Sequence, residues 1–315
     1  MDIRHLRYFI AISEERSLSA ASHRLGVAQP SLSQHVIRLE EELGLPLVVR
    51  SSRGIVLTED GRRLEQYARS ICQQMDACIE DMRSTGQKIA GSVILGLPPS
   101  VSMVLSVPLA ETVRVELPDV RLQATEAMSG FVRGWIAEET VDMGFLYDLA
   151  PGVHFDHIHL LDEDLCFFST EETWPLATPP GAPVALADLS GVEMILPSPT
   201  HGLTRSIQRH AKALGIDLNI VIEMDAMTQI KELVARGSGH TIFAPAAAHD
   251  FVSRGEMVKS RIVDPVISRP VYLCSNPDKT LTRAVSSVRE IILEVTRDLV
   301  RRGVWEGRLA PGLRP

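Results

Sequence analysis

Apolar residues recur three or four positions apart through the first 43 residues, a spacing that predicts helices. The first predicted helix spans residues 3–13. The second follows Ser17, a suitable N-cap, and ends at Gly26, because glycine adopts the left-handed backbone that a helix end needs. The third begins at Gln29-Pro30, since the fixed φ of proline suits a first helical turn. Its inward face reads Leu32, Val36, Leu39 and Leu43.

The opposite face of the third helix is polar over its first two turns and carries Gln29, Ser31, Ser33, Gln34 and His35. Short donors and acceptors at the start of a helix that follows a tight turn suit the reading of a DNA major groove. An antiparallel helix pair with a solvated face gives the same pattern, so these residues alone leave both interpretations open. Residues 45–58 then predict two short strands around a polar turn, a wing in which Arg50 and Arg53 are placed for phosphates or a narrow minor groove. The wing favours DNA binding.

One long helix is predicted from Glu59 to about Lys88. Its apolar residues form a narrow stripe made of Leu64, Tyr67, Ile71, Met75, Cys78 and Met82. A partner helix from a second copy of the chain would cover this stripe, and packing against the winged domain of the same chain is the alternative. We expect the dimer. Glycines at 86 and 91 loosen the chain after this helix and predict a hinge.

From Ser92 the pattern changes to strands that alternate with helices. A first set has strands at 93–97, 120–126 and 141–146 and helices at 101–116 and 130–137; a second set has strands at 164–168, 192–196, 218–223 and 240–244 and helices at 202–214 and 226–236; a strand at 271–274 and a helix at 281–302 return to the first set. Two α/β lobes joined by crossing strands, with a cleft between them, are the simplest architecture for this order. The last residues, from Trp305, are expected to form a loose tail.

Composition and charge restrict the class of protein. Hydrophobic residues make up 45% of the 315 residues, enough for packed cores in two or three domains. The formal net charge of -8 does not suggest nucleic acid, but residues 1–90 hold 12 Lys/Arg and 12 Asp/Glu, so the acidic excess lies in the rest of the chain. DNA affinity should therefore depend on a few placed arginines and helix termini. The sequence has no secretion signal and no run of 18 apolar residues, which indicates a cytoplasmic protein.

Residues 1 to about 90 closely resemble the winged helix-turn-helix of the LysR-type transcriptional regulators. The resemblance lies in Leu6-Arg7-Tyr8-Phe9, Ser17-Leu18-Ser19-Ala20-Ala21, Ala28-Gln29-Pro30-Ser31-Leu32-Ser33, Leu39-Glu40-Glu41-Glu42-Leu43-Gly44 and Arg50 with Leu57-Thr58-Glu59-Asp60-Gly61. It implies binding of double-stranded DNA by dimers of dimers. The DNA-binding set that we infer is Ser17, Gln29, Pro30, Ser31, Ser33, Gln34, Arg50 and Arg53. Ala28 departs from the many members that carry a Ser or Thr cap at this position.

The second half resembles the effector-binding domain of the same family, which is like a periplasmic binding protein. Gly91-Ser92-Val93 through Pro98 and Gly144-Phe145-Leu146-Tyr147 are most similar to the branch that includes the nitrogen assimilation control protein. The expected fold class is α/β with an N-terminal winged helix-turn-helix. The expected domains are the winged helix-turn-helix (1–58), a linker or dimerisation helix and hinge (59–89), a two-lobed effector-binding domain (90–302; lobe one 90–161 and 268–302, lobe two 162–267) and a loose tail (303–315).

Four loops lie at the carboxyl ends of predicted strands, where parallel α/β lobes bind ligands: residues 99–102, 128–130, 198–202 and 243–245. Small hydroxyl residues before a helix present Oγ and free backbone N–H groups to an anion. The resemblance implies effector contacts at Ser100, at Ser129 and around residues 200–202. The candidate effector-binding set is Ser100, Val101, Ser102, Ser129, Tyr147, Thr200, His201, Gly202 and Phe243.

Each Ser or Thr of this set, taken singly, also fits a simple N-cap, but their convergence on one cleft favours a small carboxylate effector. Arg205, one turn into its helix, either pairs with that carboxylate or is solvated. Tyr147 either lines the cleft or packs at the hinge.

Other patterns do not indicate catalysis or a metal. His154, His157 and His159 have no acidic or cysteine partner at suitable spacing, so we expect a surface strand there. The sequence has no Gly-x-Ser-x-Gly elbow, and residues 236–239 lack a phosphate-loop lysine. The four scattered cysteines (Cys72, Cys78, Cys166 and Cys274) read as cytosolic thiols, with Cys166 and Cys274 buried and inert. We expect no cofactor and no enzyme activity.

The leading hypothesis is a bacterial DNA-binding regulator that responds to a small-molecule effector. Its expected partners are a second copy through the long helix, a homotetramer built from such dimers, and RNA polymerase. The alternative is a metabolic or small-molecule-binding α/β protein whose N-terminal helices serve only assembly. A redox-sensing regulator is a third interpretation.

Overall fold

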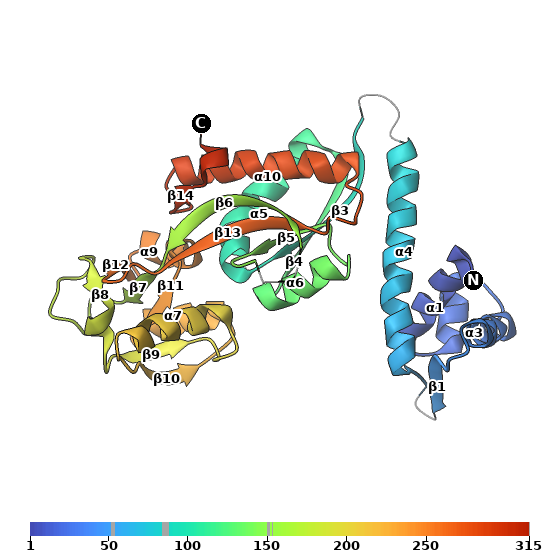
Figure 1. Cartoon of the computed structure of the whole chain (residues 1–315), viewed down its shortest axis with the longest axis horizontal. Coiled ribbons are helices and arrows are strands. Elements are labelled where there is room, and N and C mark those ends of the chain that lie inside the picture. The colour runs from blue at the N-terminus through green and yellow to red at the C-terminus, as the bar shows by residue number, and fades with distance from the viewer. Residues whose placement is uncertain (52–53, 84–87, 150–151, 153, 315) are drawn as a thin grey trace. The chain divides into compact units, whose positions relative to one another are not determined.

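The computed structural model describes residues 1–51, 54–83, 88–149, 152 and 154–314. The chain forms two compact units (Figure 1). The first comprises Met1–Gly91 with Glu138–Thr140, and the second comprises Ser92–Ala137 and Val141–Pro315.

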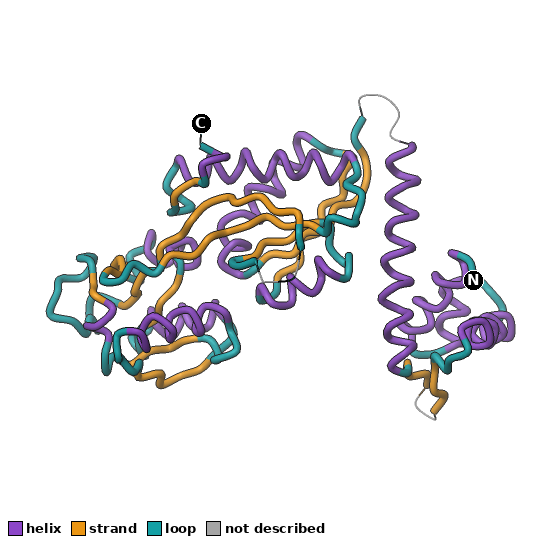
Figure 2. Tube along the Cα trace, viewed as in Figure 1, coloured by secondary structure: helices purple, strands orange, loops and turns teal. Residues whose placement is uncertain are grey.

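The first unit is built from helices and a small hairpin (Figure 2). Its elements are α1 (Ile3–Glu15), α2 (Leu18–Leu25), α3 (Gln29–Leu43), β1 (Val48–Ser51), β2 (Gly54–Leu57) and α4 (Glu59–Arg83). Ser17 Oγ accepts a hydrogen bond from the Ala20 N–H at 3.3 Å, and Gly26 ends α2 with a φ of +67°, so both predicted helix ends are confirmed. Ala28 precedes α3 and provides no side-chain cap. β1 and β2 pair antiparallel and form the predicted wing.

The core of the first unit lies between α1, α2, α3 and the base of the hairpin. Its buried residues are Ala11, Ile12, Leu18, Ala21, Leu32, Val36 and Ile55. Gly54 fixes the hairpin against the turn after α1, because a Cβ at this residue would lie 2.4 Å from the Arg16 carbonyl oxygen and its φ is +113°. The next residue, Ile55, donates its N–H to that carbonyl at 2.8 Å. Only glycine allows this close approach.

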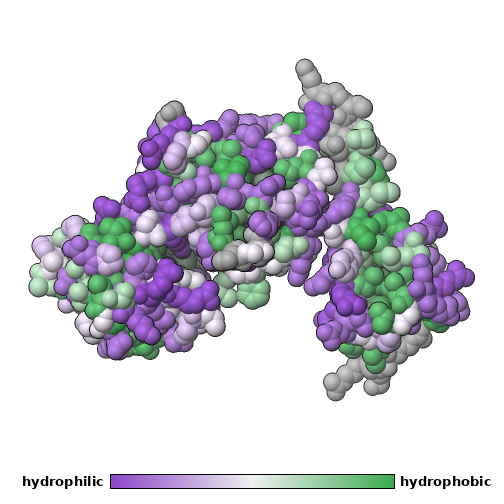
Figure 3. Space-filling view, viewed as in Figure 1, coloured by the Kyte–Doolittle hydropathy of each residue, from purple (hydrophilic) through white to green (hydrophobic). Residues whose placement is uncertain are grey.

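The long helix α4 has two apolar faces. One face packs against α1 through Leu64, Ala68 and Cys72. The other remains exposed and consists of Tyr67, Ile71, Met75 and Met82, which we call the exposed α4 face. Figure 3 shows hydrophobic side chains along α4. The predicted stripe is therefore divided: Leu64 belongs to the core of the unit, whereas the described residues of the unit leave the exposed α4 face uncovered.

Lobe one of the second unit is a six-stranded sheet with helices on both faces. Its elements are β3 (Ala90–Leu97), α5 (Pro99–Glu116), β4 (Asp119–Glu126), α6 (Ser129–Ala137), β5 (Met143–Leu146), β6 (Asp156–Asp164), β13 (Ser268–Ser275), α10 (Arg283–Arg301), β14 (Arg308–Leu309) and the 3-10 helix η3 (Pro311–Leu313). The strand order is β14-β6-β13-β5-β3-β4. β3 and β5 are parallel, whereas β13 runs antiparallel to β5 and β6. Figure 1 shows α10 above this sheet and α6 below it.

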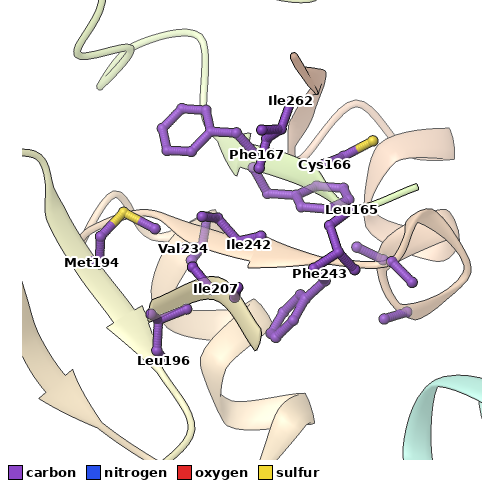
Figure 4. Packing of buried hydrophobic residues seen from close by; sticks show 14 of the residues in the cluster. Leu165, Cys166, Phe167, Met194, Leu196, Ile207, Val234, Ile242, Phe243 and Ile262 are labelled. Carbon is purple, nitrogen blue, oxygen red and sulfur yellow. The ribbon is translucent and has the colours of Figure 1, made fainter. Parts of the chain in front are cut away.

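Lobe two contains the elements between the two long crossing strands β6 and β13. These are β7 (Cys166–Ser169), β8 (Val184–Ala185), η1 (Leu186–Leu189), β9 (Glu193–Leu196), α7 (Gly202–Ala213), β10 (Asn219–Glu223), α8 (Met227–Ala235), β11 (Thr241–Phe243), η2 (Pro245–Ala248), α9 (His249–Ser253) and β12 (Val258–Val263). One sheet has the order β11-β7-β12-β8, and β9 pairs parallel with β10. Figure 4 shows the core of this lobe, whose buried residues include Phe167, Ile207 and Phe243.

The loose tail expected at residues 303–315 is wrong for the described part, up to residue 314. Trp305 is fully buried, and β14 pairs antiparallel with the outer side of β6. Leu313 is also buried. The segment is mostly polar, so the sequence does not predict that it packs. Its few apolar residues hold it against lobe one, because burial of one indole removes a large apolar surface from water.

Candidate functional site

The polar face at the start of α3 is available to a partner. Gln29, Pro30, Ser31 and Gln34 are exposed and Ser33 is half-buried. The apolar residues of the same helix point into the core of the unit, so the helix is held from one side and presents the other. This arrangement is the one that a major-groove reading helix requires.

His35 was expected on this polar face but is turned toward α1. Its ring centroid lies 4.6 Å from that of His5 and 5.1 Å from that of Tyr8. Burial lowers the pKa of His35, and the nearby His5 lowers it further. The side chain therefore contributes to the packing of α3 on α1.

The other predicted DNA contacts differ in how much of them the structure describes. Arg50 lies in β1 opposite Ile55, but its side chain is outside the described residues. Arg53 is also outside them. Ser17 uses its Oγ to cap α2, so its side chain has a structural role at the turn that precedes that helix.

A cavity of about 660 Å³ lies between the two lobes of the second unit. It is lined by Ser129, Gly130, Arg133, Tyr147, Asp148, Leu165, Gly202, Leu203, Arg205, Ser206, Arg209, Ser268, Arg269 and Pro270. Lobe one supplies the start of α6 and the end of β5, lobe two supplies the start of α7, and the crossing strand β13 supplies its first residues. Two helix N-termini therefore face the same space, and their backbone N–H groups favour an anion there.

Arginine dominates the charge of this cavity. Four arginines line it (Arg133, Arg205, Arg209 and Arg269), against a single carboxylate, Asp148. Arg133 pairs with Asp148, but its Nη1 is buried and has no partner among the described residues. Arg205 donates from Nη1 to the Thr200 carbonyl oxygen at 3.0 Å, which draws it back toward the loop before α7. The excess of positive charge makes the cavity electrostatically complementary to an anion.

Arg269 is the most firmly held of the four. Its Nη2 donates to Ser100 Oγ at 2.9 Å, and its guanidinium carbon lies 3.9 Å from the centroid of the Tyr147 ring. The Tyr147 hydroxyl and Ser100 Oγ are 2.5 Å apart. Burial raises the pKa of Tyr147, so this side chain is a neutral phenol at physiological pH. Glu163 completes the environment, because its carboxylate accepts from Arg269 Nε at 2.9 Å.

The structure brings together part of the predicted ligand site. Ser129, Tyr147 and Gly202 line the cavity, and Ser100 lies behind Arg269. His201 caps α7 by accepting from the Leu203 N–H at 3.1 Å. Besides Ser100, the members that do not line the cavity are Val101, Ser102, Thr200, His201 and Phe243, of which Val101 and Phe243 are buried in the hydrophobic cores of their lobes.

Sequence reasoning missed Arg133, Arg209 and Arg269. A signal existed for two of them, because Arg133 lies four residues after Ser129 and Arg209 four residues after Arg205, which places each pair on one helix face. Arg269 gave no such signal, since it follows the expected end of lobe two and precedes the predicted strand.

The remaining candidates have structural roles. His157 and His159 lie in β6 and pack their rings against Tyr272. No cluster of three potential metal ligands occurs among the described residues. Burial raises the pKa of both Cys166 and Cys274 to about 12, so these thiols are unreactive at neutral pH. Within the described part of the chain, no helix is long and apolar enough to span a membrane.

These two units define a transcription regulator, in which a winged helix-turn-helix accompanies a two-lobed ligand-binding domain. A model of the bacterial regulatory helix-turn-helix proteins of the lysR family matches residues 3–62, and a model of the LysR substrate binding domain matches residues 86–297. The chain belongs to the LysR family. It is a DNA-binding transcriptional regulator with an effector-binding domain and not an enzyme.

Known relatives are similar over nearly the whole chain. The nitrogen assimilation regulatory protein nac of Klebsiella aerogenes is 29% identical over 98% of this chain and 98% of its own length. Its counterpart in Escherichia coli K12 is 26% identical, with coverage of 97% and 99%. Among solved structures, a full-length OxyR variant from Pseudomonas aeruginosa has a TM-score of 0.71 at 20% identity and covers 98% of this chain and 97% of its own. CbnR in complex with its target DNA has a TM-score of 0.69 at 21% identity, with coverage of 95% and 99%.

Proposed function

We propose that the start of α3 reads base edges in the major groove, and that Arg50 and Arg53 of the wing contact the DNA backbone or minor groove. The exposure of Gln29, Pro30, Ser31 and Gln34 supports this assignment, since glutamine and serine side chains match base-edge donors and acceptors. Ser17 caps α2, the helix that precedes the turn, and the half-buried Ser33 belongs to the polar face of α3. The neutral charge balance of residues 1–90 makes sequence-specific contacts, rather than bulk attraction, the main source of affinity.

Alanine at both Gln29 and Ser33 tests this assignment. The double variant should lose footprinting at a specific site, because each good base contact is worth about 1–3 kcal/mol of discrimination. Glu41→Ala, an exposed residue near the other end of α3, is the matched control and should leave the footprint unchanged. A double variant that protects the same site with wild-type affinity would contradict the assignment.

The exposed α4 face is the proposed dimer contact. Tyr67, Ile71, Met75 and Met82 follow one another at intervals of four, four and seven residues, about one or two helical turns, the spacing at which two helices pack along a common line. Two such dimers would form the tetramer. The chain would act in the cytoplasm, with RNA polymerase as a further partner at the promoter.

The effector is proposed to be a small carboxylate bound in the inter-lobe cavity. The observation that carries this proposal is the set of four arginines around one space of about 660 Å³. Arg209 has no hydrogen-bonding partner or ion pair among the described residues, and Arg133 Nη1 is likewise free, so cationic donors are available to a ligand. A ligand regulates only if it binds one arrangement of the lobes better than another.

A thermal-shift screen of acetate, succinate, citrate, benzoate and salicylate on the full chain tests the ligand class, with isothermal titration for any compound that raises the melting temperature. Arg209→Gln should weaken binding about tenfold or more, because it removes one charged partner. Arg236→Gln, an exposed arginine at the end of α8, is the control. Binding of neutral sugars or amides in preference to every carboxylate would contradict an anionic effector.

A further inference from the structure

The segment from Val304 to Arg314 is an ordered part of lobe one. Its strand β14 pairs with β6, with Arg308 opposite Asp162 and Leu309 opposite Leu161. Gly307 allows this close approach, because a Cβ there would lie 2.3 Å from Leu161 Cδ1 and 2.9 Å from the Asp162 carbonyl oxygen. We call residues 304–314 the C-terminal segment.

Two adjacent acidic residues of β6 hold the C-terminal segment. Asp164 accepts from Arg308 at 2.7 Å and 2.9 Å. Glu163 accepts from the indole Nε1 of Trp305 at 2.8 Å. Trp305 has no exposed surface and Glu163 is only 1% exposed, so the second hydrogen bond is made inside the protein.

Glu163 also links the C-terminal segment to the cavity. Its Oε1 takes the indole N–H of Trp305, whereas its Oε2 takes the Nε–H of Arg269 at 2.9 Å. A buried carboxylate is stable only when its oxygens are paired, and two donors from different elements fix its plane. The orientation of the carboxylate in turn determines where the guanidinium of Arg269 can lie.

Arg269 carries this constraint into the ligand cavity. The guanidinium is planar, so fixing Nε on Glu163 and Nη2 on Ser100 fixes the whole group. The ring of Tyr147 covers one face of it at 3.9 Å. Arg269 lines the ligand cavity together with Arg133, Arg205 and Arg209, so its held guanidinium is placed to contact a ligand there.

We propose that Trp305 is a positioning residue of the ligand site: through the buried carboxylate of Glu163 it holds Arg269 in the geometry that receives the anion. The C-terminal segment is thus a working part of the effector-binding domain, although it lies outside the cavity. This inference rests on the proposed anion-binding function of the cavity.

The reactivity of Arg269 toward phenylglyoxal, followed on the full chain by peptide mass spectrometry, tests the positioning without any ligand. Phenylglyoxal condenses with guanidinium nitrogens that are free to leave their hydrogen bonds. Trp305→Phe keeps an aromatic ring but removes the N–H, and should raise the modification rate of Arg269 about tenfold, the change expected when a hydrogen bond to a charged group is lost. The rate at the exposed Arg209 serves as the internal reference.

Trp174→Phe is the matched control, because the Nε1 of Trp174 donates to the Thr178 carbonyl oxygen at 2.5 Å within lobe two. It removes the same N–H elsewhere in the domain and should leave the Arg269 rate unchanged. Glu163→Gln is the second variant: it keeps Trp305 in place, removes the charge that holds Arg269, and should raise the rate even if Trp305→Phe lowers the yield of folded protein. Wild-type reactivity of Arg269 in both variants would overturn the proposal.

Titration with succinate connects the positioning to binding. The affinity of Trp305→Phe should fall about tenfold relative to Trp174→Phe. If the wild type does not bind succinate, that part of the proposed function fails, while the phenylglyoxal rates still decide whether Trp305 positions Arg269. If the wild type binds and Trp305→Phe binds equally well, the inference fails and the anion site stands.

Discussion

Replacing Ile71 by glutamate should separate the subunits without unfolding them. Ile71 lies at the middle of the exposed α4 face and is not a member of the hydrophobic cluster that packs α4 on α1. Tyr67 and Met75 lie one turn to either side. The substitution therefore acts on the proposed contact between two α4 helices and leaves the packing of α4 on α1 intact.

The magnitude follows from the exposed surface. Full burial of an isoleucine side chain is worth about 1.5–3 kcal/mol, so covering the 42% of Ile71 that is exposed is worth about 1 kcal/mol per protomer and about 2 kcal/mol in a symmetric pair. A pair of carboxylates in the contact adds a desolvation and repulsion cost of about 1–2 kcal/mol. The total of about 3–4 kcal/mol should therefore raise the dimer dissociation constant about 150- to 1000-fold.

Sedimentation equilibrium over a range of concentrations measures this change directly. Gln66→Glu is the control, since it adds the same charge five residues earlier, about 140° away around the helix. Circular dichroism should show equal helix content in both variants. An Ile71→Glu chain with the mass distribution of the wild type at every concentration would refute the assignment of the exposed α4 face to dimerisation.

Three further predictions follow from local geometry. Gly54→Ala should destabilise the wing by about 1–3 kcal/mol, since its positive φ and the close carbonyl both resist a Cβ, and the loss is measurable as a lower melting temperature and weaker DNA binding. Burial opposes ionisation of Asp164, but hydrogen bonds led by that of Arg308 hold its pKa below 3.8. The ionised side chain therefore contributes its full share of stability above pH 3.8 and loses it as the pH falls through the lowered pKa. Asp164→Asn should reduce this acid-induced loss of unfolding free energy, measured by urea titration over a range of pH values. Iodoacetamide at pH 8 should alkylate the exposed Cys78 well before the buried Cys166, and faster labelling of Cys166 would reopen the redox-sensing interpretation.

The helices of the first unit could be predicted because the residues that begin and end each helix are close to it in the sequence. Ser17 caps α2, Gly26 ends it and Pro30 lies in the first turn of α3, each within a few residues of the element it controls. The missing side-chain cap at Ala28 could also be read from the sequence. The inward turn of His35 could not, because it depends on the rings that α1 brings to the same place.

The ligand cavity was only partly predictable, since its residues come from segments far apart in the chain. The rule that ligands bind at the carboxyl ends of strands found Ser129, Tyr147 and Gly202. It could not find the pair of Arg269 and Glu163, which are 106 residues apart and meet only through the register of β6 and β13. Trp305 was missed for a different reason: a single indole in a polar segment has no periodicity that marks it as buried.

The division of the arginines between the lobes explains how an anion in the cavity would act on the domain. Arg133 comes from α6 of lobe one, whereas Arg205 and Arg209 come from α7 of lobe two. A carboxylate that contacts arginines of both lobes would bind most tightly to the arrangement of the lobes that brings these arginines to a matching distance. By linkage, the ligand would then favour that arrangement over another by the ratio of its two affinities. Arg269 belongs to the crossing strand and is anchored on Glu163 and Ser100, whereas Arg205 and Arg209 are carried by α7 of lobe two. In the proposed site the anchored arginine would set where the ligand binds, and the two on α7 would couple its binding to the angle between the lobes.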